Sequence, residues 1–139
     1  MSLASYIGTN IKIPQVDINE DEGYDEDFYV GQCFADGICL YSVQAAQFTT
    51  AHVYEISSHW GIEIVEPCDS KISLESKEKL RRLLELMDSY LAEGDYFELY
   101  SCWVGEEGDS REHALTLEMK DLDIHNLKIP EKTYVLIKK

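Results

Sequence analysis

A chain of 139 residues with 45% hydrophobic and 28% charged residues has the length and composition of one globular domain. Its formal net charge of −15 disfavours direct binding to nucleic acid or to an anionic membrane surface, since both need clustered basic residues. No apolar run approaches the roughly 18 residues of a membrane-spanning helix, so we expect no membrane span.

The N-terminus and the cysteines suggest a protein of the cytoplasm. Residues 1–6 have no basic region and no long apolar core, so we expect no signal peptide. A domain of this length does not need disulfides to fold. We therefore interpret Cys33, Cys39, Cys68 and Cys102 as reduced thiols in a cytoplasmic protein.

The distribution of charge along the chain is more informative than its total. Between Ile13 and Ser70 the sequence has no lysine or arginine but holds 12 acidic residues. The other 81 residues carry 15 acidic residues and all 12 basic residues. Such a segment favours a basic partner, although an acidic surface can also serve only to keep a protein soluble.

Three short elements are predicted in the first 43 residues. Residues 10–16 alternate apolar and polar side chains and contain a proline, which predicts a short edge strand. Residues 17–27 include seven acids and too little apolar content to pack, so we expect a solvated loop. Residues 28–30 and 38–41 are strand-like runs on either side of Asp36-Gly37, a strong turn signal, and together they predict a β-hairpin.

Residues 44–60 fit two structures. Val53, Ile56 and Trp60 would share one face of a helix, whereas every second residue from 48 to 56 would share one face of a strand. We favour the helix and leave the strand open. Residues 62–65 then form a short apolar strand that ends before Pro67.

The clearest helical pattern lies between Ser73 and Gly94. Apolar side chains recur there at three- and four-residue steps: Leu80, Leu83, Leu84, Met87, Tyr90 and Leu91. Ser73 is a suitable N-cap, and Gly94 supplies the left-handed residue that often follows a helix. Glu78 lies four residues before Arg82, so we expect these two side chains to pair.

Three strand patterns follow this helix. Residues 96–104 are apolar on both faces, which predicts a central strand, and residues 113–119 and 133–137 alternate as half-buried strands do. A helix followed by three strands is typical of the α+β class. We therefore predict a single α+β domain over residues 1–139: a mainly antiparallel sheet packed, on one face, by one long helix and one shorter helix.

No group of residues in the sequence indicates a catalytic or metal site. Asp17, Asn19 and Asp21 match the start of a calcium loop, but Glu22 and Phe28 occupy positions that need glycine and glutamate. The cysteines and histidines lack zinc spacings, and the 8 glycines form no phosphate-binding motif. We predict no catalytic residue, no metal and no cofactor.

The acidic loop is the predicted binding site for a basic protein partner. Its densest part holds the candidate contact residues, Asp21, Glu22, Tyr24, Asp25, Glu26 and Asp27. Complementary charge on such a loop steers a basic partner toward it.

In size, and in its acidic segment 17–27 and aromatic strand 96–104 with the Glu106-Glu107 turn, the chain resembles the immunity proteins of bacterial toxin systems. That resemblance implies a non-enzymatic inhibitor that binds a toxin domain, with carboxylates standing in for the phosphates that a basic nuclease grips. The alternative is an enzyme or small-ligand protein with a pocket between the long helix and the sheet, lined by Trp103, His113 and a cysteine.

Overall fold

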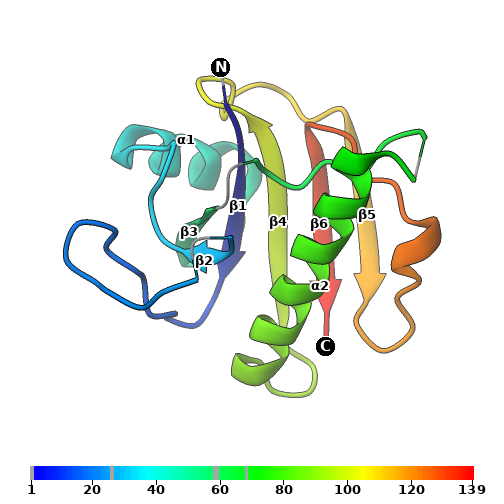
Figure 1. Cartoon of the computed structure of the whole chain (residues 1–139), viewed down its shortest axis with the longest axis horizontal. Coiled ribbons are helices and arrows are strands. Elements are labelled where there is room, and N and C mark those ends of the chain that lie inside the picture. The colour runs from blue at the N-terminus through cyan, green and yellow to red at the C-terminus, as the bar shows by residue number, and fades with distance from the viewer. Residues whose placement is uncertain (1, 26, 58–59, 68) are drawn as a thin grey trace.

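The computed structural model describes residues 2–25, 27–57, 60–67 and 69–139, and these form an α+β fold, as predicted. Within them, six strands make one sheet and two α-helices cover it (Figure 1). The elements are, in chain order, β1 (Leu3–Thr9), β2 (Tyr29–Val30), α1 (Gly37–Gln47), β3 (His52–Ser57), α2 (Lys71–Tyr90), β4 (Tyr96–Trp103), β5 (His113–Glu118), the 3-10 turn η1 (Ile124–Asn126) and β6 (Thr133–Lys138).

The strand order is β2-β3-β1-β4-β6-β5. Neighbouring strands are antiparallel except β5 and β6, which run parallel, so the sheet is mixed. β1 and β4 lie at the centre, with Tyr6 opposite Tyr100 and Ile7 opposite Leu99. The predicted central position of β4 is therefore confirmed.

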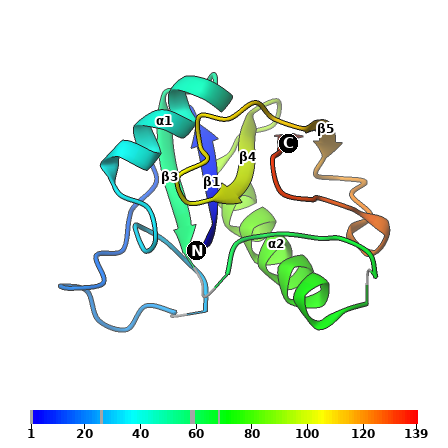
Figure 2. The ribbon, with the colours of Figure 1, turned by 90° about the horizontal axis from the view of Figure 1, so that it is seen from above.

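The two helices lie on opposite faces of the sheet, as Figure 2 shows, and not on one face as predicted. Ile7 and Leu99 belong to the core cluster that includes Leu83 and Met87 of α2. Tyr6 and Tyr100 belong to a second cluster that includes Val43 of α1. Successive residues of β1 and β4 point to opposite faces, and each face has its own helix, so all seven residues of β1 are buried.

The predicted hairpin over residues 28–41 is wrong in its second half, because α1 begins at Gly37. Asp36 is the N-cap of this helix, and its side chain accepts a hydrogen bond from the Cys39 N–H at 2.9 Å. Just before it, the buried Glu55 carboxylate accepts the backbone N–H groups of residues 33, 34 and 35 at 2.7 to 3.1 Å. The Asp-Gly pair that suggested a turn is thus a helix start.

Three further strand and helix predictions in the first half are wrong. The first strand is Leu3–Thr9 rather than residues 10–16, where the Ile13 N–H binds the Tyr54 hydroxyl at 3.0 Å instead of joining a strand. The favoured helix over residues 44–60 is replaced by the end of α1 and by β3, which pairs with β1. Residues 62–65 form no strand, only a single bridge between Ile64 and Ile129.

The long helix is confirmed, with shifted ends. Its N-cap is Ser70 rather than Ser73, which is buried and donates its hydroxyl to the Val65 carbonyl at 2.8 Å. The helix ends at Tyr90, and Gly94 follows in a turn with φ +91°.

Candidate functional site

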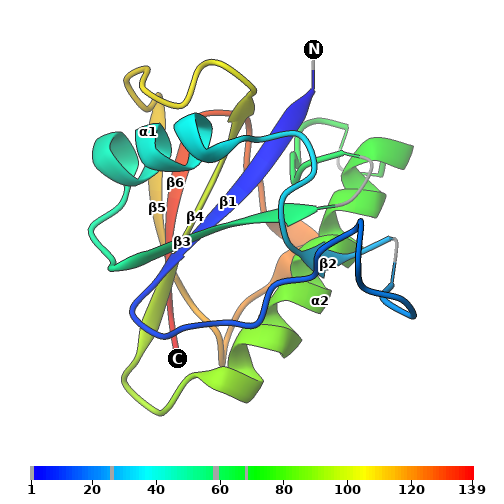
Figure 3. The same ribbon diagram turned by 90° about the vertical axis from the view of Figure 1, so that its left-hand side faces the viewer.

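The acidic loop between β1 and β2 projects at the β2–β3 edge of the sheet (Figures 1 and 3). Two of its acids hold its first turn. The Asp17 carboxylate accepts the Asn19 N–H at 2.9 Å, and the Asp21 carboxylate accepts the Asp17 N–H at 2.7 Å. These side chains therefore form local turn contacts of the kind that aspartate favours. The loop has a defined backbone, whereas sequence analysis treated it only as solvated chain.

The far end of the loop is attached to α2 by Asp25. Its carboxylate pairs with the Arg82 guanidinium, which also lies 5.2 Å from the centroid of the Phe28 ring. The other carboxylate oxygen accepts the Asp27 N–H at 2.9 Å. The hydrogen bond from Arg82, followed by that from the Asp27 N–H, holds the pKa of Asp25 below its usual value. The predicted ion pair between Glu78 and Arg82 is therefore wrong, and the Glu78 carboxylate pairs with Arg81 instead.

The structure brings the described members of the predicted site together in this one loop. Asp21, Glu22, Asp25 and Asp27 are exposed, whereas Tyr24 is half-buried with its ring edge-on to Tyr29 at 5.2 Å. Glu26 lies outside the described residues. Asp21 and Asp25 already have side-chain partners within the protein, whereas within the described residues neither a hydrogen bond nor an ion pair holds the Glu22 carboxylate.

Charge is separated in space as well as in sequence. The base-free span from Ile13 to Ser70 supplies β2, α1 and β3, which form one edge of the sheet and its cover. Eleven of the 12 lysines and arginines follow residue 70: five are in α2, one is in β6, and five are in the connections and the C-terminal residue. Several bases nevertheless contact the base-free span: Arg82 pairs with Asp25, Lys128 pairs with Glu66, and the Lys79 ammonium donates to the Trp60 carbonyl at 2.8 Å. The acidic loop therefore belongs to the edge built from the base-free span, and Arg82 of α2 contacts it at its far end.

Outside the loop, two more acids of the base-free span hold the backbone of the protein. Glu55 is buried against three backbone N–H groups, and burial, the largest cause, raises its pKa. Asp36 caps α1, and its hydrogen bond from Cys39 lowers its pKa. Asp36 and Glu55 thus fix the start of α1, and Glu55 is buried away from any partner.

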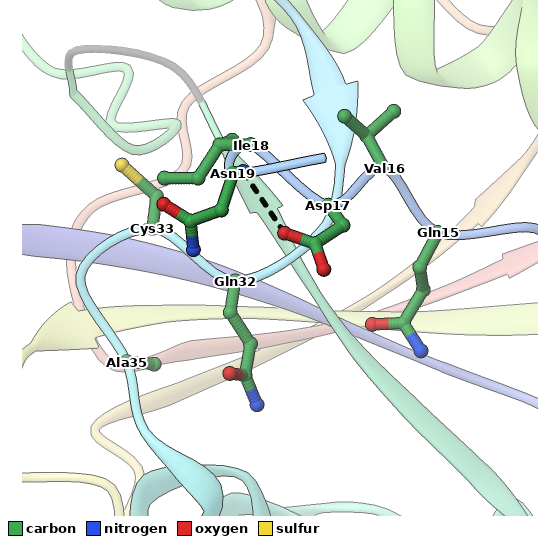
Figure 4. A pocket seen from close by; sticks show the side chains of 8 residues that line it. All are labelled: Gln15, Val16, Asp17, Ile18, Asn19, Gln32, Cys33 and Ala35. Atoms are coloured by element: carbon green, nitrogen blue, oxygen red, sulfur yellow. Dashed lines mark hydrogen bonds between the residues drawn. The ribbon is translucent and has the colours of Figure 1, made fainter. Parts of the chain in front are cut away.

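A polar hollow of about 480 Å³ lies between the acidic loop and the segment that leads into α1 (Figure 4). Asp17, Asn19 and Ile18 line it from the loop, and Gln32 and Cys33 from the opposite segment. Their amide and carboxylate groups offer hydrogen bonds, and Ile18 is 44% exposed. This hollow borders the loop on the α1 side.

An apolar groove of about 300 Å³ lies on the other side of the loop, against α2. Val16, where the loop begins, lines both this groove and the polar hollow, so the two adjoin each other at the start of the loop. The groove is lined mainly by Val16, Tyr24, Phe28, Tyr29, Leu86 and Tyr90, with Asp25 beside them.

The side chains named for the alternative pocket lie in different surroundings. The space between α2 and the sheet is filled by the core cluster around Leu83 and Leu99. Trp103 packs edge-on against Trp60 at 5.3 Å, and His113 is exposed at the start of β5. Cys102 is buried on the opposite face, where burial, the largest cause, raises the pKa of its thiol.

Among the residues whose placement is described, no three or more His, Cys, Asp or Glu side chains are arranged to hold a metal ion. Cys68 and His59 lie outside this part of the chain. In the same part, neither α1 nor α2 combines the length and the apolar character needed to cross a bilayer.

Compared with protein-family models, curated proteins and solved structures, the chain matches none.

Sequence analysis found the acidic loop but missed the groove beside it. The groove combines residues 13–30 with Leu86 and Tyr90, more than 50 positions later in the chain, and no local pattern links the two segments. In the sequence Tyr90 fits the apolar face of the helix, and only the structure shows that it is 41% exposed and lines the groove.

Proposed function

We propose that this protein is a non-enzymatic binding module of the cytoplasm that recognises a basic protein through its acidic loop. The role proposed for it is that of an immunity or inhibitor protein, which neutralises a toxin domain. The observation that carries this proposal is the position of the acidic loop on the edge built from the base-free span. Charges gathered on one side act together on an approaching partner.

The exposed carboxylates of the loop support recognition of a basic surface. Glu20 and Glu22 are exposed, and neither pairs with another side chain in the described ranges. They can therefore meet lysine or arginine groups of a partner without first breaking an intramolecular bond. The loop backbone is held by Asp17, Asp21 and Asp25, so these free carboxylates are presented from a defined structure.

Affinity capture followed by a neutralisation assay tests this proposal. The protein is immobilised, proteins from its source are passed over it at low salt, and retained proteins are identified and purified. We expect a basic protein whose enzymatic or toxic activity is blocked at a 1:1 ratio. The double variant Glu20→Gln/Glu22→Gln is expected to need a higher concentration to block it.

The matched control is Glu112→Gln/Glu118→Gln, which removes two exposed acids near the β5 edge of the sheet, far from the loop in strand order. This variant is expected to block the partner as well as the original protein does. If no basic protein is retained, or if both double variants behave alike, the proposal is wrong.

A further inference from the structure

The groove beside the acidic loop has the properties of an anchor site. Its volume of about 300 Å³ lies at the lower end of the range of about 300–1,000 Å³ for ligand pockets. Three of its lining side chains are tyrosines, Tyr24, Tyr29 and Tyr90, and Leu86 adds an aliphatic surface. Aromatic residues of this kind dominate the energetics of protein interfaces.

The groove is already formed by contacts within the protein. On one side, the Val16 N–H donates to the Val30 carbonyl at 2.8 Å, which joins the start of the loop to β2. On the other, Asp25 pairs with Arg82 of α2, and Tyr24 packs on Tyr29. A partner therefore has little loop structure to order on binding, and the entropic cost of association is correspondingly lower.

The charge of the surrounding surface identifies the class of occupant. One wall of the groove includes Tyr24 and Asp25 of the acidic loop, and exposed acids lie two residues away on either side, at Glu22 and Asp27. An acidic partner would be repelled there, and a basic one attracted. Within the groove itself, the lining carboxylate of Asp25 is occupied by Arg82. A second cation buried there would lack a partner, at a high desolvation cost.

We propose that the groove receives an apolar side chain of a basic partner segment, while lysines or arginines next to that side chain face the acidic loop. This inference rests on the proposed function and adds the anchor to it. The loop charges act mainly on the rate of association, and the anchored side chain acts mainly on the rate of dissociation.

Peptide titrations followed by NMR test the anchor directly. The probe is a capped heptapeptide with a central leucine between three lysine or arginine residues on each side. Two matched peptides replace the leucine with alanine, or all basic residues with glutamate. The reporters are the labelled side chains of Tyr24, Leu86 and Tyr90, with the amides of residues 17–25 as a separate reporter of the loop.

We expect the leucine peptide to shift the groove resonances saturably and to bind about fivefold more tightly than the alanine peptide, because its side chain buries more apolar surface. The ratio between these two peptides should persist at 0.5 M salt, although both bind more weakly. Tyr90→Ala should remove most of the leucine preference. Tyr41→Ala, which truncates a tyrosine that is 72% exposed on α1, should leave it unchanged.

The two ways of failing are distinguishable. If the leucine and alanine peptides bind equally and shift only the loop amides, the charge-based function stands and the anchor is wrong. If the glutamate peptide with leucine enters the groove as tightly as the basic one, the groove binds apolar side chains but the basic partner is wrong. If no peptide shifts the groove resonances saturably, the anchor is likewise overturned.

Discussion

Arg82, on α2, pairs with the carboxylate of Asp25 in the acidic loop, 57 positions earlier in the chain, and places its guanidinium over the Phe28 ring. This contact holds the far end of the acidic loop against α2, where Tyr24 and Asp25 line the apolar groove. It also removes one carboxylate from the set available to a partner. The loop therefore has two kinds of acids: those that hold its shape and those that face solvent.

Removal of Arg82 is expected to raise the pKa of Asp25 toward its ordinary value of 3.8, because the hydrogen bond from Arg82 is the largest cause of its depression. A carboxyl whose pKa is lowered in the folded state stabilises the protein above its unfolded pKa, and this contribution disappears as the pH falls through the folded pKa. The Arg82→Gln variant should lose that part of the acid dependence of stability. An NMR titration of the Asp25 carboxyl measures the shift.

Arg81→Gln is the matched control for this prediction. Arg81 lies next to Arg82 but pairs with Glu78 and Glu85 on the exposed side of α2. Its replacement should leave the titration of Asp25 unchanged. An Asp25 carboxyl that titrates identically in the original protein and in Arg82→Gln would show that the ion pair does not form in solution.

Replacement of two adjacent leucines of α2 by alanine is expected to lower the stability of the protein by different amounts. Leu83 is fully buried and Leu84 is half-buried. Leu83→Ala should therefore lower the free energy of unfolding by about 2–4 kcal/mol, through the cavity that it leaves, and Leu84→Ala by less. Glu85→Ala, at an exposed position, should change it by no more than about 0.5 kcal/mol. Urea unfolding of the three variants measures the order, and equal losses at all three sites would contradict the packing.

A buried glutamate is expected to be essential for the connection between α1 and β3. Glu98 of β4 is fully buried and accepts the backbone N–H groups of Thr49 and Thr50 at 3.0 Å, and it also accepts the Tyr134 hydroxyl. Glu98→Ala leaves these donors without their acceptor, which should cost on the order of 3 kcal/mol. Thermal and urea unfolding measure the loss. Glu118→Ala, at the exposed end of β5, is the control and should be nearly neutral.

The sequence predicted those elements whose patterns are local and long. The α2 periodicity, the two-sided apolar run of β4 and the alternation of β5 and β6 each extend over six or more residues, so the α+β class could be inferred from them. β1, equally central, was missed because LASYIGT mixes small and polar residues with its apolar ones and so shows neither alternation nor a continuous apolar run.

The elements of the first half of the chain were harder to predict, because carboxylates that lie far away in the sequence hold its backbone. α1 is an 11-residue helix with no charged residue, and its start depends on Glu55 of β3, which holds the segment before it. Its end is fixed in the same way by Glu98 of β4. Neither partner could be assigned to this segment from local propensity. For the same reason, the acidic loop was found by composition, whereas the groove beside it needed the fold.

The salt dependence of association between the captured basic partner and the acidic loop tests the central claim most directly. Stopped-flow association rates are measured from about 0.05 to 0.5 M salt for the original protein, Glu20→Gln/Glu22→Gln and the control Glu112→Gln/Glu118→Gln. We predict that the loop variant associates several-fold more slowly at low salt, that the control does not, and that the difference disappears at 0.5 M, where salt screens exposed charges over a few ångströms. Equal association rates for all three proteins at low salt would contradict the claim that the acidic loop steers a basic partner.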